Sequence, residues 1–317
     1  MRRDTLAHVP GLASDPLTFR GKEIRPLTGV PPFAMIDEGA GGSSRVVVDR
    51  EPDGSPETRR PLAVALGWYA AFMALHVALA WDGGRLVTTL LPDVGVWLGP
   101  VDWAIYAVFA VVAATVVGWP GTGITRRPAR GWVRMAAVPV AAGLPFLLFG
   151  FNLAPDSIIP LLLVGTPLIA LNEELFFRGV MLDVLRPLGW RSAVLWSAAL
   201  FGASHLANLV AGASVPFTVM QVAATTAGGV ALAAIRIRSG SLWPVLVVHV
   251  VLDVIAISTL TGPAVDSPIL LPVLFAWLAA NLVLWRFGWR LLAGRPDEVL
   301  DRMADGVAPD RIAKADE

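Results

Sequence analysis

The sequence predicts an all-α, polytopic membrane protein with about eight transmembrane helices. Of its 317 residues, 55% are apolar and only 16% are charged, whereas soluble domains carry about 25% charged residues. The mean hydropathy is +0.64. Apolar runs of about 20 residues, the length that crosses a bilayer core, recur from residue 61 to residue 285.

The composition excludes several other classes. Basic and acidic residues are balanced at 25 each, so the chain lacks the excess positive charge with which proteins bind nucleic acid. The sequence contains no cysteine, which excludes disulfides, thiolate metal sites and cysteine nucleophiles. We therefore expect the lipid bilayer as a partner and no nucleic acid.

The chain is predicted to have three parts. Residues 1–60 are polar and lack helical or strand periodicity, which is typical of a disordered tail. Residues 61–285 form the transmembrane domain, and residues 286–317 form a C-terminal tail. Eight spans are expected, at 61–81, 98–119, 132–151, 157–181, 193–210, 215–235, 241–260 and 267–285.

Charge predicts the orientation of these spans. The apolar stretch 86–96 is broken by Pro92, Asp93 and Gly95, and is expected to be a re-entrant or interfacial piece. Cytoplasmic loops concentrate basic residues, and on one side of the membrane the short connections carry only Arg85. Those on the other side carry nine: Arg126, Arg127, Arg130, Arg134, Arg178, Arg186, Arg191, Arg236 and Arg238. We therefore predict a multi-pass plasma-membrane protein with both termini in the cytoplasm.

Ionisable residues inside apolar spans are costly, so they indicate functional sites. The fourth predicted span ends in NEELFFRG, residues 172–179. Glu174 and Arg178 are four residues apart, so they share a helix face and can pair. Glu173 points about 100° away and has no counter-ion in the motif. The sequence thus predicts one structural carboxylate and one that is available for proton transfer.

Two further spans carry ionisable residues at helical spacing. Phe201 and His205 are four residues apart, as are His249 and Asp253. These groups and the glutamate pair lie at similar distances from the predicted cytoplasmic ends, so we expect them to converge in a site that opens toward the cytoplasmic half. His76 stands alone on the first span, and we expect its ring to hydrogen-bond a backbone carbonyl.

Three motifs in this order resemble the CPBP intramembrane proteases. This is the CAAX-protease and bacteriocin-processing, or Abi, family, which includes the prenyl-protein CAAX endopeptidase. The motifs are EExxxR, FxxxH and HxxxN/D, carried here by Glu173, Glu174 and Arg178, by Phe201 and His205, and by His249 and Asp253. The resemblance covers residues 157–260. It implies an endopeptidase that cleaves a membrane-associated or lipid-anchored protein or peptide.

The resemblance also implies a role for each motif residue. Glu173 and His205 would activate a water, while His249 and Asp253 would stabilise the oxyanion. Many family members carry Asn where this chain has Asp253, and an ionised carboxylate cannot donate a hydrogen bond to an oxyanion. Asp253 is therefore either protonated or orients His249 through its ring N–H. The residues that would hold the helix are Glu174 and Arg178.

Several alternatives stay open. Glu173, His205 and His249 match the ligand set of a catalytic zinc, and the family is often labelled a metalloprotease. HExxH is absent, and the resemblance to the CAAX endopeptidase implies a water activated directly by Glu and His, so we favour a reaction without metal and expect no cofactor. A serine dyad of Ser204 with His249 fits less well, because Ser204 is adjacent to His205 on one helix and points elsewhere. A non-catalytic immunity or scaffold protein and a proton-coupled transporter are the remaining alternatives.

Overall fold

This computed structural model describes residues 18–19, 22–23, 56–153, 158–260 and 267–307. The chain forms two compact units, Met1–Asp53 and Gly54–Glu317. In the first unit, β1 (Thr18–Phe19) and β2 (Lys22–Glu23) pair antiparallel. Most of the predicted disordered tail, 1–60, lies outside the described residues, as does the end of the predicted C-terminal tail.

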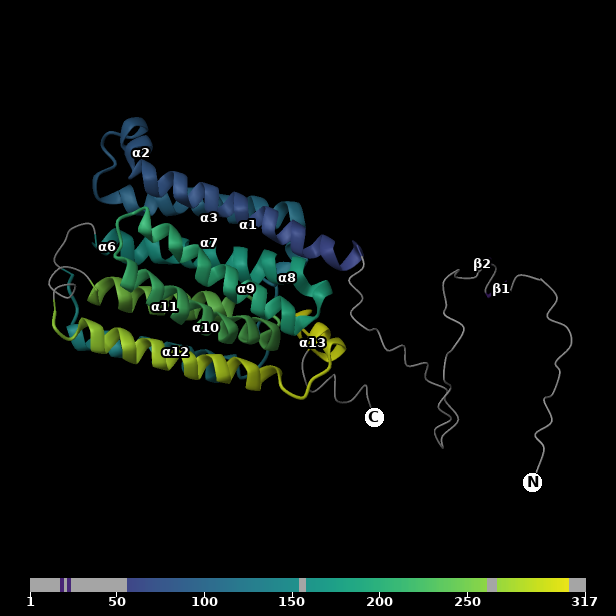
Figure 1. Ribbon diagram of the computed structural model, residues 1–317. Coiled ribbons are helices and arrows are strands. Elements are labelled where there is room, and N and C mark those ends of the chain that lie inside the picture. The colour runs from purple at the N-terminus through teal and green to yellow at the C-terminus, as the bar shows by residue number, and fades with distance from the viewer. Residues whose placement is uncertain (1–17, 20–21, 24–55, 154–157, 261–266, 308–317) are drawn as a thin grey trace, which may run out of the picture. The chain divides into compact units, whose positions relative to one another are not determined.

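The second unit is a bundle whose long helices run roughly along a common direction (Figure 1). Its helices are α1 (Pro56–Asp82), α2 (Arg85–Leu90), α3 (Leu98–Val117), α4 (Trp119–Thr122), α5 (Trp132–Val140), α6 (Ile158–Pro160), α7 (Thr166–Glu174), α8 (Leu182–Leu185), α9 (Trp190–Ser204), α10 (Val215–Ser239), α11 (Trp243–Thr259), α12 (Leu270–Leu292) and α13 (Asp297–Ala304). Segments of 3-10 or π geometry extend or join them: η1 (Gly95–Trp97), η2 (Ala141–Phe149), η3 (Leu161–Gly165), η4 (Leu175–Met181), η5 (Arg186–Leu188) and η6 (His205–Leu209).

Helices stand at all eight places where the sequence predicts a span, which confirms the all-α, polytopic class. Among the described residues, six helical segments are long and apolar enough to cross a membrane by length and composition. The helix α11 is apolar but has only 17 residues, and α9 has 15 before η6 continues it. The stretch 86–96 folds into the short α2 and η1.

The fourth span is longer than the sequence predicts. It was expected to end at residue 181, but the helical segment runs without interruption from Ile158 to Leu188. Its backbone switches to π geometry in η3 and again in η4, which begins directly after Glu174. Single π segments inside α-helices are frequent at functional sites. The extension places Glu173 near the middle of the span rather than close to one end.

Glycines bring the central helices close together. A Cβ atom on Gly288 of α12 would lie only 2.9 Å from the backbone of Ala231 in α10. A Cβ on Gly229 of α10 would lie 3.2 Å from the Cβ of Ala198 in α9. Small residues of this kind let helix backbones approach in a membrane, where van der Waals packing drives association. The helix α10 therefore packs in direct contact with both α9 and α12.

An aromatic cluster fills the core beside the EExxxR motif. Phe176 stacks on Phe72 with ring centroids 4.4 Å apart, and Phe177 meets Phe201 edge-on at 5.2 Å. All four rings are buried, so they hold η4 against α1 and α9. The Nδ1 atom of His76 lies 3.0 Å from the carbonyl oxygen of Phe72, which confirms the backbone hydrogen bond expected for this histidine.

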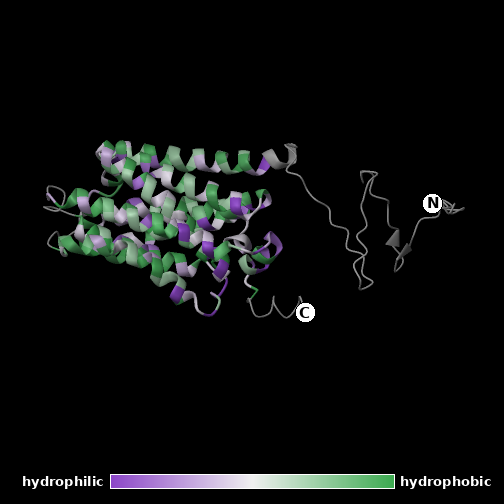
Figure 2. Ribbon diagram, turned by 60° about the horizontal axis from the view of Figure 1, so that its bottom comes forward, coloured by the Kyte–Doolittle hydropathy of each residue, from purple (hydrophilic) through white to green (hydrophobic). Residues whose placement is uncertain are grey.

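The two ends of the bundle differ in charge. Figure 2 shows hydrophilic residues gathered at the end that carries α13. We call this the arginine-rich end; its basic residues include Arg126, Arg127, Arg130, Arg186, Arg191, Arg236, Arg238, Arg290 and Arg302. At the opposite, arginine-poor end, which carries α2 and η1, Arg85 is the single basic residue in the described part of the chain.

Ion pairs fasten α13 to the arginine-rich end. Asp301 accepts hydrogen bonds from Arg186 Nε at 2.6 Å and from Trp190 Nε1 at 2.9 Å. Asp305 accepts two from Arg186, at 2.9 and 3.1 Å, and pairs with Arg126 at 3.4 Å. Partial burial disfavours the charge of Asp305, but Arg186 and then Arg126 outweigh it and hold the pKa of this carboxyl below its usual range.

We predict that Asp305→Asn lowers the free energy of unfolding at pH 7 by about 0.2–1 kcal/mol, the range for exposed ion pairs. Because the pKa of Asp305 is lowered in the folded state, its stabilisation is present above the ordinary Asp pKa of about 3.9 and disappears as the pH falls through the folded value. Thermal unfolding in detergent at pH 7 and pH 3 measures this difference. Asp93→Asn, at the arginine-poor end, is the matched control. Equal melting of wild type and Asp305→Asn at pH 7 would contradict the prediction.

Candidate functional site

Glu174 and Arg178 form the ion pair that their spacing predicts. Arg178 Nη1 lies 3.0 Å from Glu174 Oε1, and neither side chain is exposed. The guanidinium carbon of Arg178 also lies 3.9 Å from the centre of the Phe201 ring, a cation–π contact. Phe201 therefore supports the arginine, which gives this motif residue a structural role.

Glu174 makes a second contact, which the sequence analysis missed. Its Oε1 atom lies 2.6 Å from Nδ1 of His249 on α11. A carboxylate accepts hydrogen bonds, so this contact assigns the ring proton to Nδ1 and leaves Nε2 facing away from Glu174. Helical spacing reveals partners on the same helix only, so it could not reveal this contact between two helices.

Two more carboxylates surround the other ring nitrogen of His249. Its Nε2 atom lies 3.4 Å from Glu173 Oε2 and 3.6 Å from Asp253 Oδ1. Both distances exceed an ordinary N–H···O hydrogen bond of about 2.7–3.2 Å. Glu174 therefore accepts the hydrogen bond that orients the ring of His249, while Glu173 and Asp253 lie beside Nε2.

His205 lies where α9 passes into η6. Its Nδ1 atom lies 3.0 Å from the carbonyl oxygen of Phe201, so Nδ1 is the donor and Nε2 is left as an acceptor in the neutral ring. The two rings also meet edge-on with centroids 5.1 Å apart. The FxxxH spacing therefore fixes both the position and the tautomer of His205.

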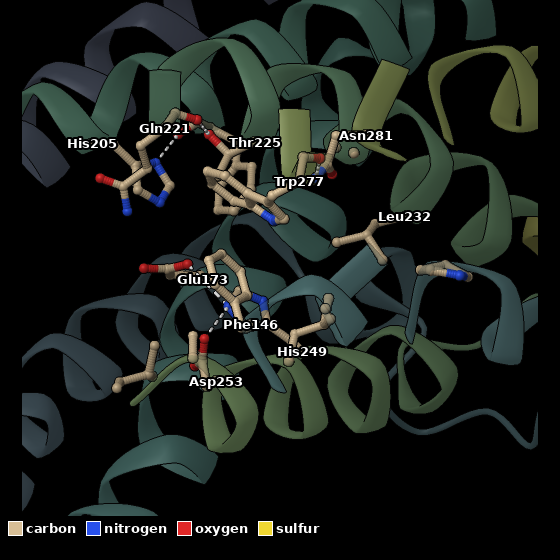
Figure 3. A pocket seen from close by; sticks show the side chains of 18 of the residues that line it. Phe146, Glu173, His205, Gln221, Thr225, Leu232, His249, Asp253, Trp277 and Asn281 are labelled. Carbon is tan, nitrogen blue, oxygen red and sulfur yellow. Dashed lines mark hydrogen bonds and ion pairs between the residues drawn. The ribbon is translucent and has the colours of Figure 1, made fainter. Parts of the chain in front are cut away.

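One cavity of about 300 Å³ brings these groups together. Glu173, His205, His249 and Asp253 all line it, and Figure 3 shows them around a common space. Further polar lining comes from Asn208, Gln221, Thr225 and Asn281. These four side chains carry no charge, so the pattern of ionisable residues in the spans did not predict them. The sequence pattern that could have indicated them is the presence of amide and hydroxyl side chains within apolar spans.

The cavity extends toward the arginine-poor end, so the expectation that the site opens toward the predicted cytoplasmic half is wrong. Its lining reaches Asn208, Phe217 and Leu260, next to the helix ends on that side. Toward the arginine-rich end, its lining on α10 stops at Leu232, although the helix continues to Ser239. The physical reason is the longer fourth span, which moves Glu173 away from the arginine-rich end.

The residues that would bind zinc if it were present, Glu173, His205 and His249, are not arranged as a metal site. In the described part of the chain, no three His, Asp or Glu side chains are grouped so that they could hold a metal ion. Glu173 and His249 are neighbours, but their closest contact is a nitrogen–oxygen distance of 3.4 Å. The residues present therefore do not fit a three-ligand zinc site in this arrangement.

Fold and site together define a polytopic membrane protein with an acid–base cluster buried between its helices. Residues 155–255 match the family model described as type II CAAX prenyl endopeptidase Rce1-like. This match confirms the resemblance to the CPBP, or CAAX-protease, family, and it spans all seven motif residues. The matched segment, about a third of the chain, is thus similar to the membrane-embedded CAAX endopeptidases. No curated protein and no solved structure matches the chain.

We predict that Glu174→Ala destabilises the protein by about 3–5 kcal/mol, because it leaves Arg178 as an unpaired buried charge. Replacing both partners, with Glu174→Leu and Arg178→Met, removes that charge and restores most of the stability. The double variant stays inactive because His249 has lost its Nδ1 partner. Thermal unfolding in detergent and peptide hydrolysis measure the two effects.

The exposed Glu298 of α13 provides the control for this experiment. Glu298→Ala should change neither melting nor hydrolysis. A Glu174→Ala protein that is as stable as wild type and defective only in chemistry would show that the roles of Glu173 and Glu174 are exchanged.

Proposed function

We propose that this protein is an intramembrane endopeptidase that hydrolyses a peptide bond of a membrane-associated or lipid-anchored protein or peptide. The observation that carries the proposal is the convergence of Glu173, His205, His249 and Asp253 on one cavity between membrane helices. All four residues lie in the segment that matches the CAAX endopeptidase family. Proton-transfer groups in a partly dry cavity are what amide hydrolysis requires.

Glu173 is the proposed general base. The carboxylate of Glu173 lines the cavity. The adjacent Glu174 is not available as a base, because it is paired with Arg178 and His249. A water held between Glu173 and the acceptor Nε2 of His205 would lose a proton to Glu173 as its oxygen attacks the peptide carbonyl carbon. Glu173 would then return that proton to the departing amine as the C–N bond breaks, so that protons balance over the cycle.

His249 is the proposed oxyanion donor. Glu174 holds the ring through Nδ1, so that Nε2 faces Glu173 and Asp253. An imidazolium at this position donates from Nε2 to the oxyanion that develops on the carbonyl oxygen. The charge that stabilises the imidazolium comes from Glu174, 2.6 Å from Nδ1, while Asp253 lies 3.6 Å from Nε2.

The proposed setting is the plasma membrane, with both termini in the cytoplasm. The excess of arginine at one end of the bundle supports this orientation. The transmembrane domain, 61–285, would then hold a catalytic core at 157–260, and the tails 1–60 and 286–317 would lie in the cytoplasm.

We predict that Glu173→Gln reduces turnover by about 10²–10⁴-fold, the usual effect of losing a general base. The amide keeps the shape of the side chain and cannot accept the proton, so melting should change little. Hydrolysis of a pool of lipid-tethered, quenched fluorescent peptides by purified protein measures turnover. Glu298→Gln is the matched control, with the same change on the exposed face of α13.

Two results would contradict this assignment. Wild-type turnover in Glu173→Gln would remove Glu173 from the mechanism. If the wild-type protein cleaves no peptide, and mass spectrometry finds the same membrane peptides in cells that carry wild type and Glu173→Gln, the endopeptidase proposal fails. A non-catalytic immunity or scaffold protein would then be favoured.

We further propose that the reaction needs no metal, and this predicts resistance to chelation. Protein treated with EDTA and then dialysed should keep its hydrolytic activity, and added zinc should not raise it. Elemental analysis of the active protein should find zinc well below one equivalent. Loss of activity on chelation, with stoichiometric recovery on adding zinc, would establish Glu173, His205 and His249 as ligands instead.

Asp253→Asn provides a second arm of the same test. An amide donates a hydrogen bond where a carboxylate cannot, so direct activation by Glu173 and His205 predicts retained or increased turnover in Asp253→Asn. Asp93→Asn is the control for the same change outside the cavity. Complete loss of turnover in Asp253→Asn would show that the negative charge at this position is essential.

A further inference from the structure

The arginine-rich end of the bundle is closed. Arg236, only 3% exposed, donates from Nη2 to the carbonyl of Gly121 at 2.8 Å and from Nε to that of Thr122 at 2.9 Å. These bonds hold α4 over the end of α10, and α13 packs beside them with Leu300 fully buried. The hollow beneath, next to Asp305, measures about 10 Å³, the smallest space that holds one water. A space of this size does not admit a peptide.

Burial decreases along α10 and α11 toward the other end. In α10, every residue from Ala227 to Ile237 is buried, whereas between Val215 and Thr226 only Thr218 and Ala224 are. In α11, most residues of the first two turns are buried, and none from 250 to 257 is. On α11 and the residue after it, the cavity lining runs from His249 to Leu260, mostly in the less buried half, and on α10 it runs from Phe217 in the less buried half to Leu232 in the buried half. The space around Glu173 is therefore reached from the arginine-poor end.

Polar side chains line the way from that end to Glu173. Asn208 donates to Gln221 Oε1 at 2.9 Å, and Thr225 lies one turn deeper on α10. Asn281 of α12 faces the same cavity (Figure 3). An extended peptide that enters an apolar region must find partners for its N–H and C=O groups. These amides and this hydroxyl supply such partners along the path to the site.

Charge shows which side of the membrane this end faces. At the arginine-poor end Arg85 is accompanied by Asp82, Asp93 and Asp102, so the net charge of this stretch is negative. Short connections rich in arginine stay in the cytoplasm. The arginine-poor end, and with it the wide part of the cavity, then faces away from the cytoplasm.

We propose that the site takes its substrate from the non-cytoplasmic side of the membrane. The substrate class is the extracytoplasmic segment of a membrane-anchored protein, or an exported peptide bound to the outer leaflet, rather than a cytoplasmic lipid-modified tail. This inference rests on the endopeptidase function proposed above. It follows from the closed arginine-rich end, the open arginine-poor halves of α10 and α11, and the arginine distribution.

The absence of cysteine from the chain permits a direct test by thiol labelling. Three single-cysteine variants are needed: Ser214→Cys at the arginine-poor end, Thr225→Cys inside the cavity, and Thr125→Cys at the arginine-rich end. Ser214 and Thr125 are exposed, and neither side chain makes a hydrogen bond or ion pair that cysteine would break. Intact cells are treated with a charged, membrane-impermeant methanethiosulfonate before and after permeabilisation.

We expect Ser214→Cys and Thr225→Cys to be labelled in intact cells, and Thr125→Cys only after permeabilisation. Labelling of Thr225→Cys only after permeabilisation, or labelling of Thr125→Cys in intact cells, would overturn the inference. Failure of Thr225→Cys to react under either condition would overturn it as well, because the cavity would then be closed to water from both sides. Reaction with a membrane-permeant maleimide verifies that each thiol is reactive.

A second arm tests the substrate class. The quenched peptide pool is tethered to a single-span anchor on either its cytoplasmic or its non-cytoplasmic side, and cleavage is expected only on the non-cytoplasmic side. Cleavage on the cytoplasmic side would overturn the inference. Labelling does not depend on turnover. If neither reporter is cleaved, the endopeptidase proposal is contradicted, and the thiol labelling still tests the access route.

Discussion

The buried carboxylate of Glu174 is the contact on which the rest of the site depends. One of its oxygens meets both Arg178, from its own helix, and His249, from α11. Removing charges from water costs several kcal/mol per ion unless they are paired with good geometry. This pairing therefore fixes the separation and rotation of α7 and α11. It also sets the tautomer of His249 and turns its free nitrogen toward Glu173.

The surroundings of this contact make it rigid. Phe176 and Phe177 are fully buried next to the glutamate, and Phe201 lies under the guanidinium of Arg178. Gly229 brings α10 so close that a Cβ there would lie 3.1 Å from Arg178 Nη2. Water has little room here, and polar contacts are stronger in such a dry, low-dielectric interior. Glu174 and Phe201 thus fix the positions of His249 and His205.

The bundle divides into a packed half and a hollow half. Toward the arginine-rich end, α4, α13 and the arginine network seal the helices together. Toward the arginine-poor end, α10 and α11 are less buried, and the cavity of about 300 Å³ lies between the helices. Glu173 and the free nitrogen of His249 lie at the boundary between these halves. Rigid support on one side and access on the other is what a positioned acid–base site needs.

The sequence by itself determined the helices and the local pairs. Apolar length matches the thickness of a bilayer, and the period of 3.6 residues places Glu174 with Arg178 and Phe201 with His205. Only the tertiary structure decided that Glu174 meets His249, that Gln221 and Asn281 join the cavity, and that the cavity faces the arginine-poor end. The physical reason is that periodicity fixes which residues share one helix face, whereas helix rotation depends on close packing at small residues such as Gly229 and Gly288.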